Sequence, residues 1–129
     1  MKNLHNSSPD GIHFLMEFFG CDSQQLNSIE FWKKLLMDAI ADAEIRVLNK
    51  HFYQFTPHGI TGYFLLSASH ISIHTWPEYA YVACDVFSCS GDDEAMNIVS
   101  YIKKNLKYEK TKTRKIKRGF KINAIRLNS

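Results

Sequence analysis

Apolar residues follow strand-like spacing over most of the chain and helical spacing in two segments. Residues 12–19, IHFLMEFF, are almost entirely apolar, which predicts a buried strand that carries one carboxylate, Glu17. Residues 70–76, HISIHTW, alternate with a period of two, and the turn signal TPHG at 56–59 predicts a hairpin ahead of them. Further strands are expected at residues 45–55, 60–69, 79–89 and 112–122.

The two helical segments lie between these strands. In the first, Asn27 is expected as the N-cap because Glu30 follows three residues later. Its apolar residues recur at helical spacing: Ile29, Trp32, Leu36, Ile40 and Ala43. The second, residues 91–106, begins with acidic residues and has lysines near its end, as the helix dipole favours. The order β-α-β-β-β-β-α-β predicts an α+β two-layer sandwich, in which an antiparallel-rich sheet carries both helices on one face.

The length and composition fit one folded domain. With 129 residues, of which 45% are hydrophobic, the chain can form one core, so residues 1–129 are expected to be a single domain. No apolar run approaches the roughly 20 residues that span a bilayer, and the polar start does not resemble a signal peptide. We therefore expect a cytoplasmic protein with no membrane partner. Cys21, Cys84 and Cys89 match neither a disulfide framework nor a zinc pattern and are expected to be thiols.

Charge is distributed unevenly along the chain. Residues 1–100 contain five Lys or Arg against twelve Asp or Glu, whereas residues 101–129 contain eleven against one. Such a basic segment can bind nucleic acid. However, TKTRKIKRGFKI at 111–122 partly alternates, as an exposed edge strand does, and lysines commonly guard such edges. The edge strand is favoured and no nucleic acid is expected; the segment could also complement the acidic remainder of the chain, within a protomer or across a dimer.

The segment LLSASHISIHTWPEY at 65–79 carries more reactive side chains than a buried strand needs. A serine in a strained backbone, such as Ser69, can attack the carbonyl of the preceding residue and convert the amide to an ester. Elimination across its Cα–Cβ bond then breaks the chain and leaves a dehydroalanine, which hydrolyses to a pyruvoyl group. This chemistry requires a base and a group that holds the tetrahedral oxygen. His74 and Thr61 could serve, but composition alone does not select them.

Two histidines of this segment suggest a second kind of site. His70 and His74 lie four residues apart on one face of the expected strand, so a metal pair is conceivable. No third ligand has a suitable spacing, so we expect no metal and interpret His70 as structural. Taken alone, Phe55 and Trp76 are expected to be core aromatics and Glu78 a surface residue.

Four blocks of the sequence belong together: HFLMEFFGCD (13–22), FTPHGITG (55–62), SASHISIHTWPEY (67–79) and CDVFSC (84–89). In combination they resemble the small prokaryotic S-adenosylmethionine decarboxylase proenzymes, and the resemblance covers nearly the whole chain. It implies cleavage between Ala68 and Ser69, which gives a β chain of residues 1–68 and an α chain of residues 69–129. The first residue of the α chain becomes the pyruvoyl cofactor, whose carbonyl forms a Schiff base with the substrate and accepts electrons as carbon dioxide leaves.

The resemblance also implies roles for individual residues. His74 drives the elimination, Thr61 holds the processing intermediate, and Cys89 returns a proton to the substrate carbon after decarboxylation. Phe55 stacks on the adenine, and Glu78 binds the ribose hydroxyls. The decarboxylated product is the aminopropyl donor for spermidine synthesis. The assembly that the resemblance implies is a homodimer of αβ units with sites at or near the interface.

One position departs from the pattern. The family usually has glutamate where this chain has Ala68, on the acyl side of the scissile bond. The side chain at position 68 takes no part in the bonds that form and break, so cleavage remains possible. Processing can be slower and the substrate preference can change. Two alternatives stay open at this point: a pyruvoyl-dependent ornithine or arginine decarboxylase on the same scaffold, and a non-processing regulatory homologue.

Overall fold

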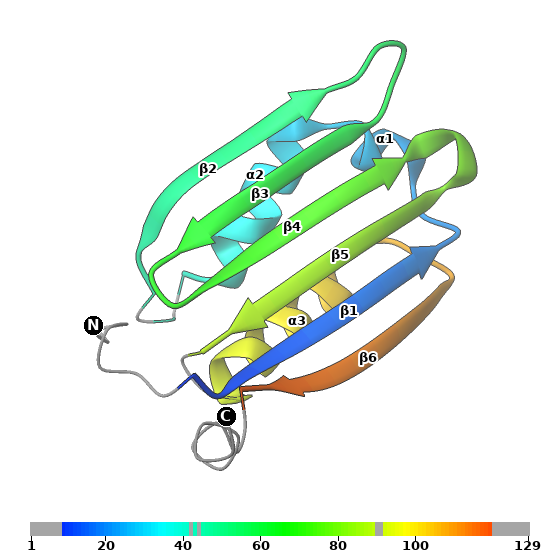
Figure 1. Ribbon diagram of the computed structural model, residues 1–129. Helices are drawn as coiled ribbons and strands as arrows, with labels where there is room; N and C mark the ends of the chain where they lie inside the picture. Colours follow the sequence, from blue (N-terminus) through cyan, green and yellow to red (C-terminus); the bar gives the residue numbers. More distant parts are fainter. Residues whose placement is uncertain (1–8, 42, 44, 90–91, 120–129) are drawn as a thin grey trace, which may run out of the picture.

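One sheet of six antiparallel strands forms the framework of the molecule, in the order β2-β3-β4-β5-β1-β6. It is seen in a computed structural model that describes residues 9–41, 43, 45–89 and 92–119 (Figure 1). The strands are β1 (Gly11–Phe19), β2 (Val47–Gln54), β3 (Ile60–Leu66), β4 (Ser69–Trp76), β5 (Tyr81–Ser88) and β6 (Lys110–Arg118). The predicted antiparallel sheet is therefore confirmed. The last three residues of the strand expected at 112–122 lie outside the described residues.

Helices α2 (Ile29–Ala39) and α3 (Asp92–Asn105) lie on the same side of the sheet, behind it in Figure 1. Every second side chain of a strand points to one face of the sheet, so alternate strand residues meet these helices. The largest fully buried side chains come from both: Trp32, Phe18, Phe64, Met16, Leu26, Leu36, Ile60, Leu66, Ile71, Ile73, Ile98 and Ile102. Helices α2 and α3 are the two that the periodicity predicts.

Two short elements were not expected from the periodicity. Helix α1 (Ser23–Leu26) precedes α2, and a one-turn 3-10 helix, η2 (Pro77–Tyr79), joins β4 to β5. Asp22 caps α1, because its Oδ1 accepts hydrogen bonds from two backbone N–H groups of the first turn. Each of these elements is too short to show a repeat of apolar residues. Both elements lie beside the candidate functional site.

The predicted N-cap of α2 is wrong by one residue. Ser28 caps this helix, and its Oγ accepts a hydrogen bond from the Phe31 N–H at 3.1 Å. Asn27 instead closes α1, with its backbone N–H donating to the Ser23 carbonyl at 3.2 Å. Because α1 takes up the residues before α2, the start of α2 moves by one position and the Asn27 side chain finds other partners.

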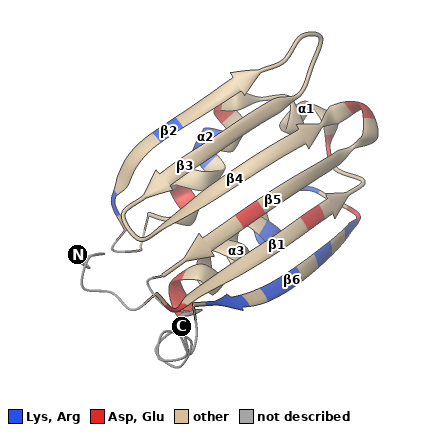
Figure 2. Cartoon of the chain, viewed as in Figure 1, with Lys and Arg blue, Asp and Glu red and all other residues tan. Residues whose placement is uncertain are grey.

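Strand β6 lies at the edge of the sheet beside β1, which confirms the edge-strand interpretation of the basic segment. Six of its nine residues are Lys or Arg, and Figure 2 shows them spread along the strand. A row of cations on an edge opposes pairing with a further strand. The concentration of positive charge at the end of the sequence is thus explained by the position of this strand.

The side of the sheet opposite to α2 and α3 is here called the open face. Among the described residues no helix covers it (Figure 1). Alternation along the strands assigns to it Glu17 of β1, Thr61, Tyr63 and Leu65 of β3, His70, Ser72, His74 and Trp76 of β4, and Tyr81 and Phe87 of β5. Tyr63, Leu65 and Trp76 are large and exposed. Large exposed apolar side chains on an uncovered sheet face are typical of a surface that meets a partner.

No helix within the described part of the chain has both the length and the apolar character needed to cross a bilayer.

The core between sheet and helices makes a direct stability prediction. Phe64 of β3 is fully buried, so Phe64→Ala leaves a cavity and should lower the free energy of unfolding by about 3–5 kcal/mol. Met37 of α2 is 40% exposed, so Met37→Ala should change it by less than about 0.5 kcal/mol. Urea unfolding of the two variants measures the difference; equal effects would contradict the assignment of the core.

Candidate active site

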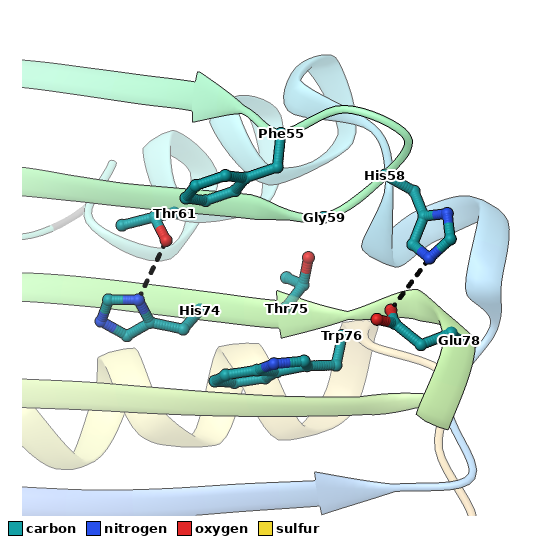
Figure 3. A pocket seen from close by; sticks show the side chains of 8 residues that line it. All are labelled: Phe55, His58, Gly59, Thr61, His74, Thr75, Trp76 and Glu78. Atoms are coloured by element: carbon teal, nitrogen blue, oxygen red, sulfur yellow. Dashed lines mark hydrogen bonds and ion pairs between the residues drawn. The ribbon is translucent and has the colours of Figure 1, made fainter.

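A pocket of about 330 Å³ opens where β2 turns into β3 and where β4 ends at η2 (Figure 3). It is lined by Phe55, His58, Gly59, Thr61, His74, Thr75, Trp76 and Glu78. Four of these residues, Phe55, Thr61, His74 and Glu78, are site residues that the family resemblance implies. Four residues spread between positions 55 and 78 of the sequence therefore line one pocket.

Strand pairing brings the two polar groups at one end of this pocket together. Thr61 of β3 lies directly opposite His74 of β4, and a hydrogen bond of 3.1 Å joins Thr61 Oγ1 and His74 Nδ1. Both side chains lie on the open face. The next residues of the two strands are joined as well, because the Ile60 N–H donates a hydrogen bond to Thr75 Oγ1 at 2.9 Å. The strand ladder thus fixes Thr61 and His74 without help from the loops.

The remaining walls come from the 55–59 loop, from Trp76 at the end of β4 and from η2. Phe55, which is 47% exposed, and Trp76, which is 40% exposed, present their rings on opposite sides of the hollow (Figure 3). At the other end from His74, Glu78 Oε1 lies 3.2 Å from His58 Nε2. Phe55 and Trp76 are not core aromatics, contrary to the expectation drawn from each residue alone. A planar group could lie between the two rings, with a carboxylate at one end.

Ser69 lies outside this pocket. It begins β4, pairs with Leu66 across a two-residue turn, and lies five residues before His74. At about 3.3 Å per residue, the two Cα atoms are roughly 16 Å apart. Alternation also turns Ser69 toward the helices, together with Ile71, while His74 is on the open face. Within one chain, His74 cannot reach Ser69.

A second set of groups surrounds Ser69. Ser69 Oγ is buried and has no hydrogen-bond partner among the described residues. The carbonyl of Ala68, which precedes it, accepts a hydrogen bond from the backbone N–H of Cys89 at 2.9 Å. The turn itself is held by the Ser67 N–H, which donates to the Arg46 carbonyl at 2.9 Å. The bond between residues 68 and 69 is therefore flanked by an unpartnered hydroxyl and a polarised carbonyl.

Cys89 differs from the other two cysteines in its surroundings. Cys21 and Cys84 are buried in the core, whereas Cys89 is only partly buried. Burial raises the pKa of the Cys89 thiol, and the nearby Arg118 guanidinium offsets part of that rise. The thiol is consequently protonated at neutral pH and can act as a proton donor.

Trp76 and His58 line the pocket, but the sequence alone does not identify them as site residues. Trp76 is two residues after His74, so strand alternation places both on the same face, and that signal could have identified it. His58 lies in a turn, and no periodic signal distinguishes it. His70 packs against Phe87, whereas His74 is hydrogen-bonded to Thr61, and four strand residues separate their Cα atoms by about 13 Å. Within the described residues, no three His, Cys, Asp or Glu side chains lie close enough to hold a metal ion.

Comparison with known proteins identifies relatives that match most of the chain. The family model described as S-adenosylmethionine decarboxylase matches residues 12–119. The S-adenosylmethionine decarboxylase proenzyme of Sulfurihydrogenibium sp. (strain YO3AOP1) is 42% identical over 109 residues, which cover 84% of this chain and 82% of that protein. The proenzyme of Clostridium botulinum (strain Langeland) is 38% identical, over 84% of this chain and 94% of its own.

A solved structure is also similar. The crystal structure of the adenosylmethionine decarboxylase from Aquifex aeolicus VF5 has a TM-score of 0.80 and 35% identity, and the match covers 88% of this chain and 94% of that one. The family model spans most of the chain, and the relatives named here carry the same description. This chain therefore belongs to the S-adenosylmethionine decarboxylase family.

Proposed function

We propose that this chain is the proenzyme of a pyruvoyl-dependent S-adenosylmethionine decarboxylase that acts in the cytoplasm and supplies the aminopropyl donor for spermidine synthesis. The observation that carries the proposal is the state of Ser69, whose buried Oγ has no hydrogen-bond partner among the described residues and follows a carbonyl bound by the Cys89 N–H. Family membership supports the same substrate. We expect residues 1–129 to be a single domain, in which the described residues form a layer of sheet and a layer of helices.

Self-cleavage begins at the bond between Ala68 and Ser69. Ser69 Oγ adds to the Ala68 carbonyl carbon, and the negative charge on the carbonyl oxygen is stabilised by the Cys89 N–H that already donates to it. The amide nitrogen of Ser69 then leaves, so that an ester replaces the amide. Removal of the Ser69 Cα proton breaks the Cβ–Oγ bond, which releases residues 1–68 with a free carboxylate. Hydrolysis of the resulting dehydroalanine releases ammonia and leaves the pyruvoyl group on residues 69–129.

The base for this elimination comes from a second copy of the chain. Ser69 Oγ points to the helix side, so the tetrahedral geometry of Cα inclines its hydrogen toward the open face. His74 of the same chain is on the open face but roughly 16 Å away along the strand. If two open faces pack with their strands running in opposite directions, the Ser69 end of each chain meets the Thr61 and His74 end of the other. The active unit is accordingly a homodimer of αβ units with composite sites.

The pocket residues fit the nucleoside part of the substrate. Phe55 and Trp76 offer aromatic faces to the adenine and to the sulfonium, and a cation over an aromatic face gains about 0.5–2 kcal/mol. The Glu78 carboxylate can accept hydrogen bonds from both ribose hydroxyls. The pyruvoyl group supplies a carbonyl that condenses with the substrate amine and draws electrons from the bond to the carboxylate. Cys89 Sγ holds the proton that the substrate carbon then receives.

Self-cleavage is tested by the mass of the purified protein. The wild-type chain should give two fragments, residues 1–68 and residues 69–129, and the second should carry a pyruvoyl group at its first residue. Ser69→Ala removes the attacking oxygen, so this variant should give one full-length chain. Intact mass spectrometry reads both results at once. A wild-type protein that remains a single chain would overturn the proposed function.

The two contributions of Cys89 can be separated by Cys89→Ala. The backbone N–H stays in place, so self-cleavage should still go to completion. Loss of the proton donor should lower kcat for decarboxylation by about 10²–10⁴-fold. Cys21→Ala, which changes a buried core cysteine, is the matched control and should retain kcat. A Cys89→Ala variant with wild-type kcat would assign the proton donor to another group.

A further inference from the structure

One wall of the pocket is the loop of residues 55–59, which carries Phe55, and another is η2, which carries Glu78. Helix α1 and Asn27, the residue that follows it, contact both walls. Ser23 Oγ donates a hydrogen bond to the Pro77 carbonyl at 3.0 Å, in the wall that carries Glu78. Asn27 Oδ1 accepts hydrogen bonds from the Gly59 N–H and from Gln54 Nε2, each at 2.8 Å, in the wall that carries Phe55. Ser23 and Asn27 are four residues apart, which puts them on the same side of one helical turn.

A second hollow of about 340 Å³ lies next to the first pocket and is lined by Ser23, Gln24, Asn27, His58, Pro77 and Glu78. It shares His58 and Glu78 with the first pocket. Beside this hollow, the side chains of Ser23 and Asn27 tie the two walls to α1 through direct hydrogen bonds.

Asn27 makes the larger contribution. Gly59 has a backbone φ of +109°, a conformation that side-chain-bearing residues rarely adopt, and its N–H is bound by Asn27. The Gly59 carbonyl accepts from the Phe55 N–H at 2.8 Å and from Gln54 Nε2 at 3.0 Å. Gln54 donates to Asn27 as well, so a single side-chain oxygen ties together the start and the end of loop 55–59.

We propose that Asn27 is a positioning residue for nucleoside recognition, because it fixes the loop that carries Phe55 relative to the wall that carries Glu78. The inference rests on the proposed roles of Phe55 and Glu78. Loosening this loop changes the spacing between the group that stacks on adenine and the group that binds ribose. Thr61 and His74 are held by the β3–β4 ladder, and Ser69 lies at the other end of β4, so the reacting groups stay in place.

The test compares Asn27→Ala, Asn27→Asp and the control Asn105→Ala. Asn105 is an exposed asparagine of α3, remote from the pocket, whose Nδ2 donates to the Tyr101 carbonyl at 2.9 Å. Asn27→Ala should raise KM for S-adenosylmethionine about tenfold, with kcat within about twofold of wild type. Asn27→Asp keeps an acceptor oxygen for both donors and should restore KM to within about twofold of wild type. Asn105→Ala should leave KM unchanged.

A second probe separates nucleoside recognition from general damage to the fold. 5′-Methylthioadenosine contains the nucleoside but lacks the amino acid, so its inhibition constant should rise in Asn27→Ala by the same factor as KM. Phenylhydrazine reacts with the pyruvoyl carbonyl, and its rate should be unchanged. An unchanged inhibition constant, or a loss of kcat with no change in KM, would overturn the inference.

Three further variants keep the test decisive. If Asn27→Ala does not fold, Gln54→Ala removes one of the two donors bound to Asn27 Oδ1 and should raise KM by about threefold. A wild-type KM in Gln54→Ala would then overturn the inference. Glu78→Gln and Phe55→Ala should both raise KM. If neither does, the proposed substrate site itself is wrong, whereas a rise in these two without a rise in Asn27→Ala contradicts only the role of Asn27.

Discussion

The extended geometry of β4 controls how this protein can work. A strand advances about 3.3 Å per residue and turns successive side chains to opposite faces, so Ser69 and His74 are separated by roughly 16 Å and by the thickness of the sheet. No rotamer of either side chain closes that gap. The strand also has neighbours on both sides, β3 and β5, which fix its register through two ladders. The serine and the histidine of the proposed self-cleavage therefore lie in two separate places on each chain.

This separation gives the rest of the structure a consistent interpretation. One end of β4 carries the bond between Ala68 and Ser69 that we propose is cleaved, the Cys89 N–H that polarises its carbonyl and the Cys89 thiol, whose pKa is raised by burial. The other end carries the Thr61–His74 pair and the pocket between Phe55, Trp76 and Glu78. The open face, with its exposed Tyr63 and Leu65, connects the two ends. In the proposed homodimer, a second chain packed on this face in the opposite direction would complete two equivalent sites.

Much of this could be predicted from the sequence. The apolar periods identified all six strands and both long helices, and the basic segment was identified as an edge strand, because burial on one face dictates these patterns. Helix α1 was missed because four residues cannot show a helical period, and the N-cap of α2 was consequently assigned to Asn27 instead of Ser28. Trp76 taken alone is expected in the core, but its alternation with His74 along the strand indicates the open face. The sequence places Ser69 at the end of a strand expected at 60–69, whereas the structure begins β4 at Ser69, so its separation from His74 along one strand became visible only in the structure.

The central claim is that each site takes Ser69 from one chain and His74 from the other, and co-expression of two inactive variants tests it most directly. Ser69→Ala and His74→Ala chains with different tags are expressed together, and mixed dimers are isolated through both tags. The account predicts by intact mass that the His74→Ala chain of the mixed dimer is cut after residue 68, although neither variant is cut when expressed alone. If the His74→Ala chain stays whole in the mixed dimer, the base acts within its own chain and the composite site is wrong.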